Sequence, residues 1–302
     1  MTSMTLRPAP YPPNTDVFKD LDGVIRDFVL HGYTPDDTLA DPGAIVVTQG
    51  SCFARNLASS LSRQGMRVAH LNVNEFINTP IANAMFFEHV FKGADCDPVI
   101  RQIFGQIMNA GQVAEFRELV ARCRAFVLTV GVAPVWFMKG TDNMVFEPDK
   151  RRLDQFEMRT LPPSWNADQI RRIVAAVRTV NQSARIFLTL SPAPLNYSFE
   201  FPSTIVGDCL SKSTLRVAIH EVLLGKPEGV RYWPSFEVVR WVGSHLGPVF
   251  GAEDNQPRHV SDFIVDAIVK SFIRVHGGGE RPPQEARPLL ENTAPFTLAR
   301  NF

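Results

Sequence analysis

Short apolar runs rich in β-branched and aromatic residues alternate along this chain with stretches of helical periodicity. Runs of this length and composition are typical of strands buried on both faces. The strand-like runs cover 44–48, 125–130, 185–190 and 230–233, and helical spacing covers 53–61, 74–92, 98–122, 170–180, 210–224 and 260–275. Strands that alternate with helices form parallel βαβ units. The pattern therefore predicts an α/β protein, a three-layer α/β/α sandwich with a central, mostly parallel sheet.

The 302 residues allow one large domain or two small ones. Residues 1–43 are rich in proline and aspartate, and we expect an extended N-terminal arm, with one or two helical turns, laid on the domain. The chain from 277 onward contains a run of glycines, then prolines and charged residues, which is typical of a flexible C-terminal tail. The prediction is one domain over 44–276, between the arm and the tail at 277–302.

Charge and motif content exclude several classes of protein. Lys plus Arg number 31, as do Asp plus Glu, and no basic stripe occurs, which argues against a nucleic-acid partner. No apolar run approaches the ~20 residues of a membrane span. The four cysteines form no Cys-x-x-Cys pair and no histidine pair has metal spacing, so we expect no metal and no disulfide framework.

Nucleotide and phosphate motifs are also missing from the sequence, so we expect no cofactor. The first residues lack the apolar segment of a signal peptide, and together with the cysteine content this favours a reduced, cytoplasmic protein. No helical stretch has an apolar face that indicates a dimer contact, so the sequence does not predict the oligomeric state.

Ligands of open parallel sheets bind beyond the carboxyl ends of the strands. Ser51 follows the first predicted strand directly after Gly50 and begins a helix, where free N–H groups stabilise a developing oxyanion. This position indicates a nucleophile, although serine is also a common N-cap that carries no other function. Cys52 is a competing nucleophile, since the start of a helix lowers the pKa of a thiol. Alternatively, Cys52 is a small buried apolar residue.

A serine nucleophile needs a general base. Among the seven histidines, His259 lies in a polar loop just before the last predicted helix, where it can face the same edge of the sheet as Ser51. Glu253 and Asp254 are near enough in sequence to orient its ring. A histidine in a loop is alternatively an ordinary surface residue.

Seven segments resemble, in order, the blocks of the GSCFA-domain family, which is related to the SGNH (GDSL-like) hydrolases and the PC-esterases. The first, Gly50-Ser51-Cys52-Phe53-Ala54, spells the motif after which the family is named. The others lie at 78–80, 129–136, 188–195, 211–216, 232–237 and 258–261. The resemblance covers about 44–272 and implies the SGNH-hydrolase/flavodoxin-like form of the sandwich.

The resemblance also implies roles for single residues. In SGNH enzymes the serine of the first block is the nucleophile, here Ser51, and the histidine of the last block is the base, here His259. The oxyanion is held by the serine N–H, a glycine N–H and an asparagine side chain from Gly-x-Asn. This chain has Ala133 where that asparagine belongs, and losing such a donor typically costs ~3 kcal/mol. Asn78, or a backbone N–H near Gly131, is the candidate replacement.

The acid of the triad is a second departure. SGNH hydrolases place an aspartate three residues before the histidine, where this chain has Gln256, and Asp254 is five residues before it. Either the loop brings Asp254 to the ring, or the site works as a Ser–His dyad.

These roles predict a serine esterase or O-acyltransferase that acts on an O-acyl ester, with O-acetyl the expected group. The substrate is a small molecule or a glycan, since the family's relatives modify glycans. Ser191, Trp136 and Trp233 lie at or after the ends of predicted strands and are candidates for substrate binding, although both tryptophans also suit plain packing at the rim. The alternative is a non-catalytic glycan- or partner-binding module that keeps the fold without the oxyanion asparagine.

Overall fold

The computed structural model describes residues 9–72, 75–105, 108–146 and 148–277. Five parallel strands form the central sheet in the order β2-β1-β3-β7-β8. Their bounds are β1 Ile45–Gly50, β2 Arg67–Asn72, β3 Ala125–Val130, β7 Arg185–Leu190 and β8 Val230–Tyr232. The predicted α/β sandwich is confirmed, and the strand order is that of flavodoxin-like sheets, whose ligands bind where the order reverses. Here the order reverses between β1 and β3.

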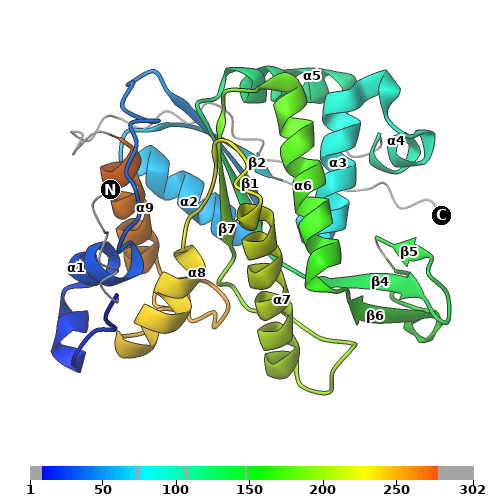
Figure 1. The fold of residues 1–302 in the computed structure, drawn as a ribbon. Helices are drawn as coiled ribbons and strands as arrows, with labels where there is room; N and C mark the ends of the chain where they lie inside the picture. The colour runs from blue at the N-terminus through cyan, green and yellow to red at the C-terminus, as the bar shows by residue number, and fades with distance from the viewer. Residues whose placement is uncertain (1–8, 73–74, 106–107, 147, 278–302) are drawn as a thin grey trace, which may run out of the picture.

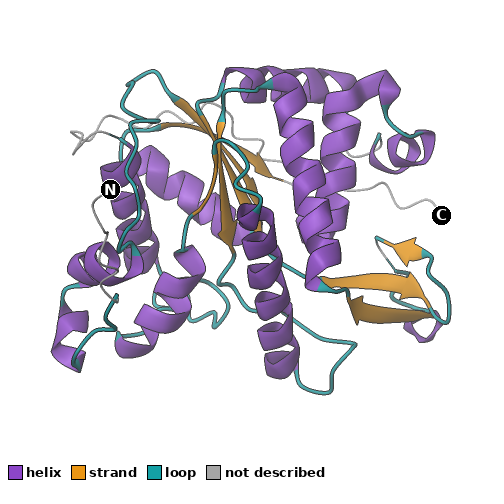
Figure 2. Ribbon diagram, viewed as in Figure 1, coloured by secondary structure: helices purple, strands orange, loops and turns teal. Residues whose placement is uncertain are grey.

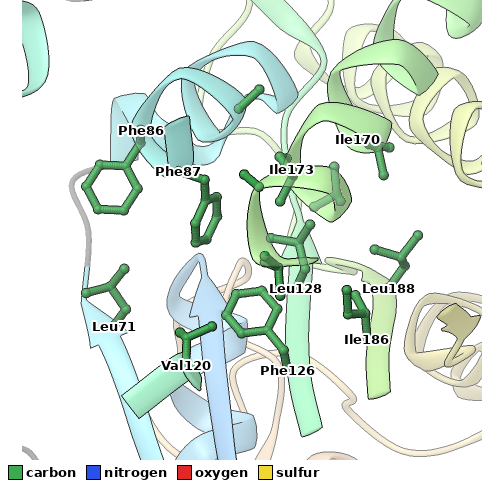
Figure 3. Close-up of a cluster of buried hydrophobic side chains, with 14 of the residues drawn as sticks. Leu71, Phe86, Phe87, Val120, Phe126, Leu128, Ile170, Ile173, Ile186 and Leu188 are labelled. Atoms are coloured by element: carbon green, nitrogen blue, oxygen red, sulfur yellow. The ribbon is translucent and has the colours of Figure 1, made fainter. Parts of the chain in front are cut away.

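Helices cover both faces of this sheet (Figures 1 and 2). One face carries α3 (Pro80–Lys92), α5 (Ala110–Arg122), α6 (Pro163–Val180) and α7 (Thr204–Leu224). The other carries α2 (Cys52–Arg63) and α9 (Asp262–His276). Every residue of β1 and β3 is buried, as the continuous apolar runs predicted. Phe87 of α3 and Phe126 of β3 meet edge to face between the layers, and Figure 3 shows this part of the core.

A second sheet was not predicted from the sequence. It is antiparallel, has the order β5-β4-β6, and is inserted between β3 and α6. Its strands are β4 Pro134–Met138, β5 Met144–Val145 and β6 Phe156–Thr160. In Figure 1 this sheet lies beside the lower end of α6.

The long helical stretches expected between the first two strand runs are divided. Residues 74–92 contain a 3-10 turn at Glu75–Asn78 before α3, and 98–122 form α4 (Pro98–Phe104) and α5. Asn109 starts α5 through a capping box with Gln112. Because such a box fixes a helix start, the apolar periodicity cannot run through it.

The arm is more helical than the sequence suggested. It has a 3-10 turn at Thr15–Lys19, then α1 (Leu21–Val24), which continues as a π-helical turn at Ile25–Val29. His276 of α9 binds the arm through a 2.8 Å hydrogen bond between its Nδ1 and Asp36 Oδ1, and its carbonyl accepts from Leu39 N–H at 2.7 Å. The predicted tail falls almost entirely on 278–302, outside the described residues.

Candidate active site

Gly50 joins β1 to α2 in a conformation that only glycine tolerates. Its φ is +140°, and a Cβ at this position would lie 2.5 Å from the carbonyl oxygen of Thr129 and 2.7 Å from its Cβ. The next residues of the motif explain the rest of the turn, since Phe53 and Ala54 are buried and hold the first turn of α2 on the sheet. Strand, glycine and helix start therefore fix the place of Ser51, between β1 and β3.

Ser51 is the N-cap residue of α2, but its side chain makes no capping hydrogen bond. The hydroxyl instead donates to Ser191 Oγ, at the carboxyl end of β7, over 3.3 Å. Capping is the use of serine at this position that needs no further function. That use does not account for this hydroxyl, which lies over the ends of the strands.

Asn78 and Gly131 lie beside the two serines. A Cβ on Gly131 would be 3.8 Å from Asn78 Cβ and 4.0 Å from Ser191 Cβ, and Val132 N–H donates to the Asn78 carbonyl over 3.4 Å. Asn78 is 5% exposed, and its Oδ1 is buried without a hydrogen-bond partner. The structure thus brings together four of the predicted site residues, including an amide side chain whose acceptor atom is not used.

Polar residues on α7 support this cluster, although the sequence had indicated no role for them. Lys212 is 3% exposed and donates from Nζ to the Gly131 carbonyl at 2.6 Å, and Ser211 Oγ accepts from Ala133 N–H at 3.0 Å. Burial lowers the pKa of Lys212 to about 8, although Asp208, one turn earlier, raises it. The signal for Ser211 and Lys212 was present, because both lie in the segment 211–216 that resembles a family block.

Arg240 holds the chain that leaves β7. Its Nε donates to the carbonyl of Pro192 at 2.8 Å, and its terminal nitrogen donates to Asp208 Oδ2 at 2.7 Å. The other Asp208 oxygen accepts from Leu195 N–H at 2.9 Å. This pair keeps the loop after Ser191 in one position against α7.

His259 and Asp254 contact each other despite their five-residue separation. Nδ1 of His259 lies 2.5 Å from Asp254 Oδ2, because the chain reverses at Asn255, whose φ is +57°. The turn is closed by Gly251 N–H, which donates to the His259 carbonyl at 2.9 Å. The hydrogen bond from His259 lowers the pKa of Asp254. About half of the imidazole is exposed, with a side-chain exposure of 48%.

The loop of His259 lies at the same edge of the sheet as Ser191. Phe250 pairs with Val260 across this loop, and its ring centre is 5.5 Å from the guanidinium of Arg240, which also holds Pro192. The structure shows no hydrogen bond between Ser51 and His259, both of which it describes. In the form described, the Ser51 hydroxyl is bound to Ser191.

The two tryptophans lie in different surroundings. Trp136, on β4, is half-buried and packs against Phe199 with ring centres 5.0 Å apart. Phe199 in turn packs against the exposed ring of Tyr197. Trp233 is 5% exposed and packs edge to face against Tyr33 and Phe272. The structure brings Trp233 into the core rather than to the serines, and its role in substrate binding stays a prediction.

Within the described ranges, the structure contains no group of three metal-ligating side chains, and no helix there is long and apolar enough to cross a membrane. A cavity of about 610 Å³ lies between the arm and the segment after β8, lined among others by Phe28, Tyr33 and Trp241. None of the predicted site residues lines this cavity, so the candidate active site is the cluster around Ser51.

A comparison with family models agrees with this geometry. The model of the GSCFA family matches residues 104–272, which is more than half of the chain and includes Gly131, Ser191 and His259. The Gly50–Ala54 segment precedes the matched residues. No curated protein matches the chain. Together with the α/β sheet and the cluster where its strand order reverses, the match shows that this chain belongs to the GSCFA family.

Proposed function

We propose that the protein is a serine esterase or O-acyltransferase of the SGNH type, with Ser51 as nucleophile. One observation carries this proposal: the Ser51 hydroxyl lies at the reversal of strand order without capping its helix. Its bond to Ser191 keeps it beside Gly131 and Asn78. A hydroxyl in this setting has the free N–H groups of a helix start next to it, which suit a developing negative charge.

In the proposed reaction, Ser51 Oγ attacks the ester carbonyl and its proton passes to Nε2 of His259. Asp254 binds Nδ1, which leaves Nε2 free for this transfer and stabilises the charged ring. The histidine returns the proton to the leaving alcohol as the tetrahedral intermediate collapses to an acyl-enzyme. Water then takes the acyl group in an esterase, and a sugar hydroxyl takes it in a transferase.

The Ser51 hydroxyl must turn from Ser191 toward His259 before it can react. The half-exposed imidazole on its loop leaves room for this approach, and bonds between catalytic groups are often long before substrate binds. The oxyanion is assigned to Ser51 N–H and Gly131 N–H. The Asn78 amide is the third donor, because its buried side chain lies at this cluster.

The proposed substrate is an uncharged O-acyl ester, with O-acetyl as the group, carried by a small molecule or a glycan. Trp136 and Phe199 support a sugar, since half-buried and exposed rings side by side offer faces on which a sugar ring stacks. Ser191, 1% exposed and bound to Ser51, is assigned to hold the substrate near the nucleophile.

The test combines a fluorophosphonate probe with hydrolysis of p-nitrophenyl acetate. We expect the wild-type protein to be labelled and Ser51→Ala to remain unlabelled. His259→Ala should react at least about 100-fold more slowly than the wild-type protein. Ser244→Ala is the matched control, because this exposed serine bonds only locally to Trp241. Cys52→Ala separates the thiol from the hydroxyl and should retain activity. Equal labelling of the Ser51→Ala variant would contradict the assignment.

The non-catalytic binding module remains the second candidate, favoured by Ala133 at the asparagine position. This module would bind an acetylated oligosaccharide without turnover, and Ser51→Ala would leave that binding unchanged. An enzyme instead converts the oligosaccharide, and its Ser51→Ala variant binds without converting it.

A further inference from the structure

Lys212 is a buried cationic side chain that the proposed reaction does not use. It is 3% exposed, in the middle of α7, and a buried ammonium group is costly unless it is well bound. Its Nζ donates to the carbonyl oxygen of Gly131 at 2.6 Å. This places the charge directly behind the residue that follows β3, at the point where the strand order reverses.

The Gly131 carbonyl and the Val132 N–H belong to the same peptide group. A cation on the carbonyl oxygen withdraws electron density from the group, and this makes the N–H a stronger donor. The Val132 N–H has a weak partner in this structure, the carbonyl of Asn78 at 3.4 Å. Two residues after Gly131, Ala133 N–H donates to Ser211 Oγ at 3.0 Å. The successive residues Ser211 and Lys212 of α7 therefore both bind the segment that follows β3.

We propose that Lys212 is a positioning residue of the oxyanion site: it holds the peptide group after Gly131 and strengthens the Val132 N–H as a further oxyanion donor beside the Asn78 amide. This inference rests on the proposed function of Ser51. When the oxyanion forms, Val132 N–H exchanges its long bond to Asn78 for a bond to the charged oxygen. Lys212 itself does not touch the substrate.

The charge of Lys212 depends on the groups that face it. Its burial lowers its pKa to about 8, Asp208 on α7 and Cys52 at the start of α2 raise it, and Arg240 lowers it. A lowered pKa means that the amine is charged below about pH 8 and neutral above it. We therefore expect kcat to fall as the pH rises through this value.

Activity gives the first readout, with Lys212→Met, Lys212→Arg and Arg216→Met as variants. Lys212→Met should lower kcat for p-nitrophenyl acetate roughly 10- to 100-fold with little change in KM, since the loss falls on the transition state. It should also remove the alkaline fall, whereas Lys212→Arg keeps the charge and moves that fall to higher pH. Arg216→Met, one turn further along α7, should change neither quantity.

A second readout does not depend on activity. In labelled protein, the amide resonance of Val132 should shift between about pH 6 and about pH 10 with the midpoint of the Lys212 titration, and Lys212→Met should abolish that shift. The resonance of Gly140, in the turn after β4, serves as the control. Circular dichroism and thermal unfolding establish that each variant is folded.

The two readouts separate this inference from the proposed function. A wild-type protein without Ser51-dependent labelling refutes the enzyme, yet a Val132 titration that depends on Lys212 still supports the charge on this peptide group. Two results overturn the inference: an active protein whose Lys212→Met variant keeps kcat within about twofold, or a Val132 resonance that does not respond to Lys212.

Discussion

Replacing Gly50 with alanine should disrupt both the strand-to-helix turn and the position of Ser51. An added Cβ would lie 2.5 Å from Thr129 O and 2.7 Å from Thr129 Cβ, both on the adjacent strand β3. These atoms cannot rotate away, because β3 is a central strand with every residue buried. A new methyl group in a packed core typically costs about 1–3 kcal/mol. The φ of +140° adds about 1–2 kcal/mol of backbone strain, so we expect a total near 3 kcal/mol.

Gly140→Ala is the matched control for this change. Its φ is +72°, but a Cβ there meets nothing within 4 Å, so only the backbone strain of about 1–2 kcal/mol applies. Urea unfolding followed by circular dichroism gives the free energy of unfolding of both variants and of the wild-type protein. The reasoning is refuted if Gly50→Ala proves no less stable than Gly140→Ala. Labelling by the fluorophosphonate probe should fall in Gly50→Ala alone, because only that change moves Ser51.

Three further predictions concern stability and are read from the same unfolding experiment. Ser51→Ala should cost under about 1 kcal/mol, since no capping bond is lost, whereas Asn109→Ala breaks a capping box and should cost about 1–2 kcal/mol; equal costs would contradict this. Burial lowers the pKa of His70 to about 4, so the unfolded chain takes up its proton first and stability should fall by at most about 3 kcal/mol as the pH drops from the ordinary histidine value to this one. His70→Gln should lessen that fall, and an unchanged pH dependence would refute it. Asp208→Ala should cost about 3 kcal/mol by leaving Arg240 without its partner, and the double variant with Arg240→Ala should cost less than the sum of the single changes; simple additivity would exclude the coupling.

The buried strands could be predicted because their signal is local. β1, β3 and β7 are short, mostly apolar runs, as expected of strands covered on both faces, and β8 was also predicted although it is a three-residue edge strand that contains Arg231. β2 escaped because it is an edge strand whose sequence mixes Arg67, His70 and Asn72 with apolar residues. The antiparallel sheet of β4, β5 and β6 escaped because its pairs join residues far apart in sequence, and its strands have only two to five residues.

The candidate site divides in the same way. Ser51 stands out in the sequence because a strand, a glycine and a helix start meet at one point. The contact between Asp254 and His259 depends on a chain reversal at Asn255 that the spacing of residues leaves open. Lys212 lies in a segment that resembles a family block, but its partner, the Gly131 carbonyl, is 81 residues away.

By itself the sequence determined the α/β class, four of the five strands of the main sheet and the place of Ser51 at a strand end. These features follow from local periodicity and from the preference of each residue for its backbone conformation. Only the tertiary structure decided which groups surround that serine: Ser191, Asn78 and Gly131 beside it, with Lys212 behind. They come from segments that the parallel crossovers carry to one edge of the sheet. Contacts of this kind are set by the packing of whole layers, which no stretch of sequence records.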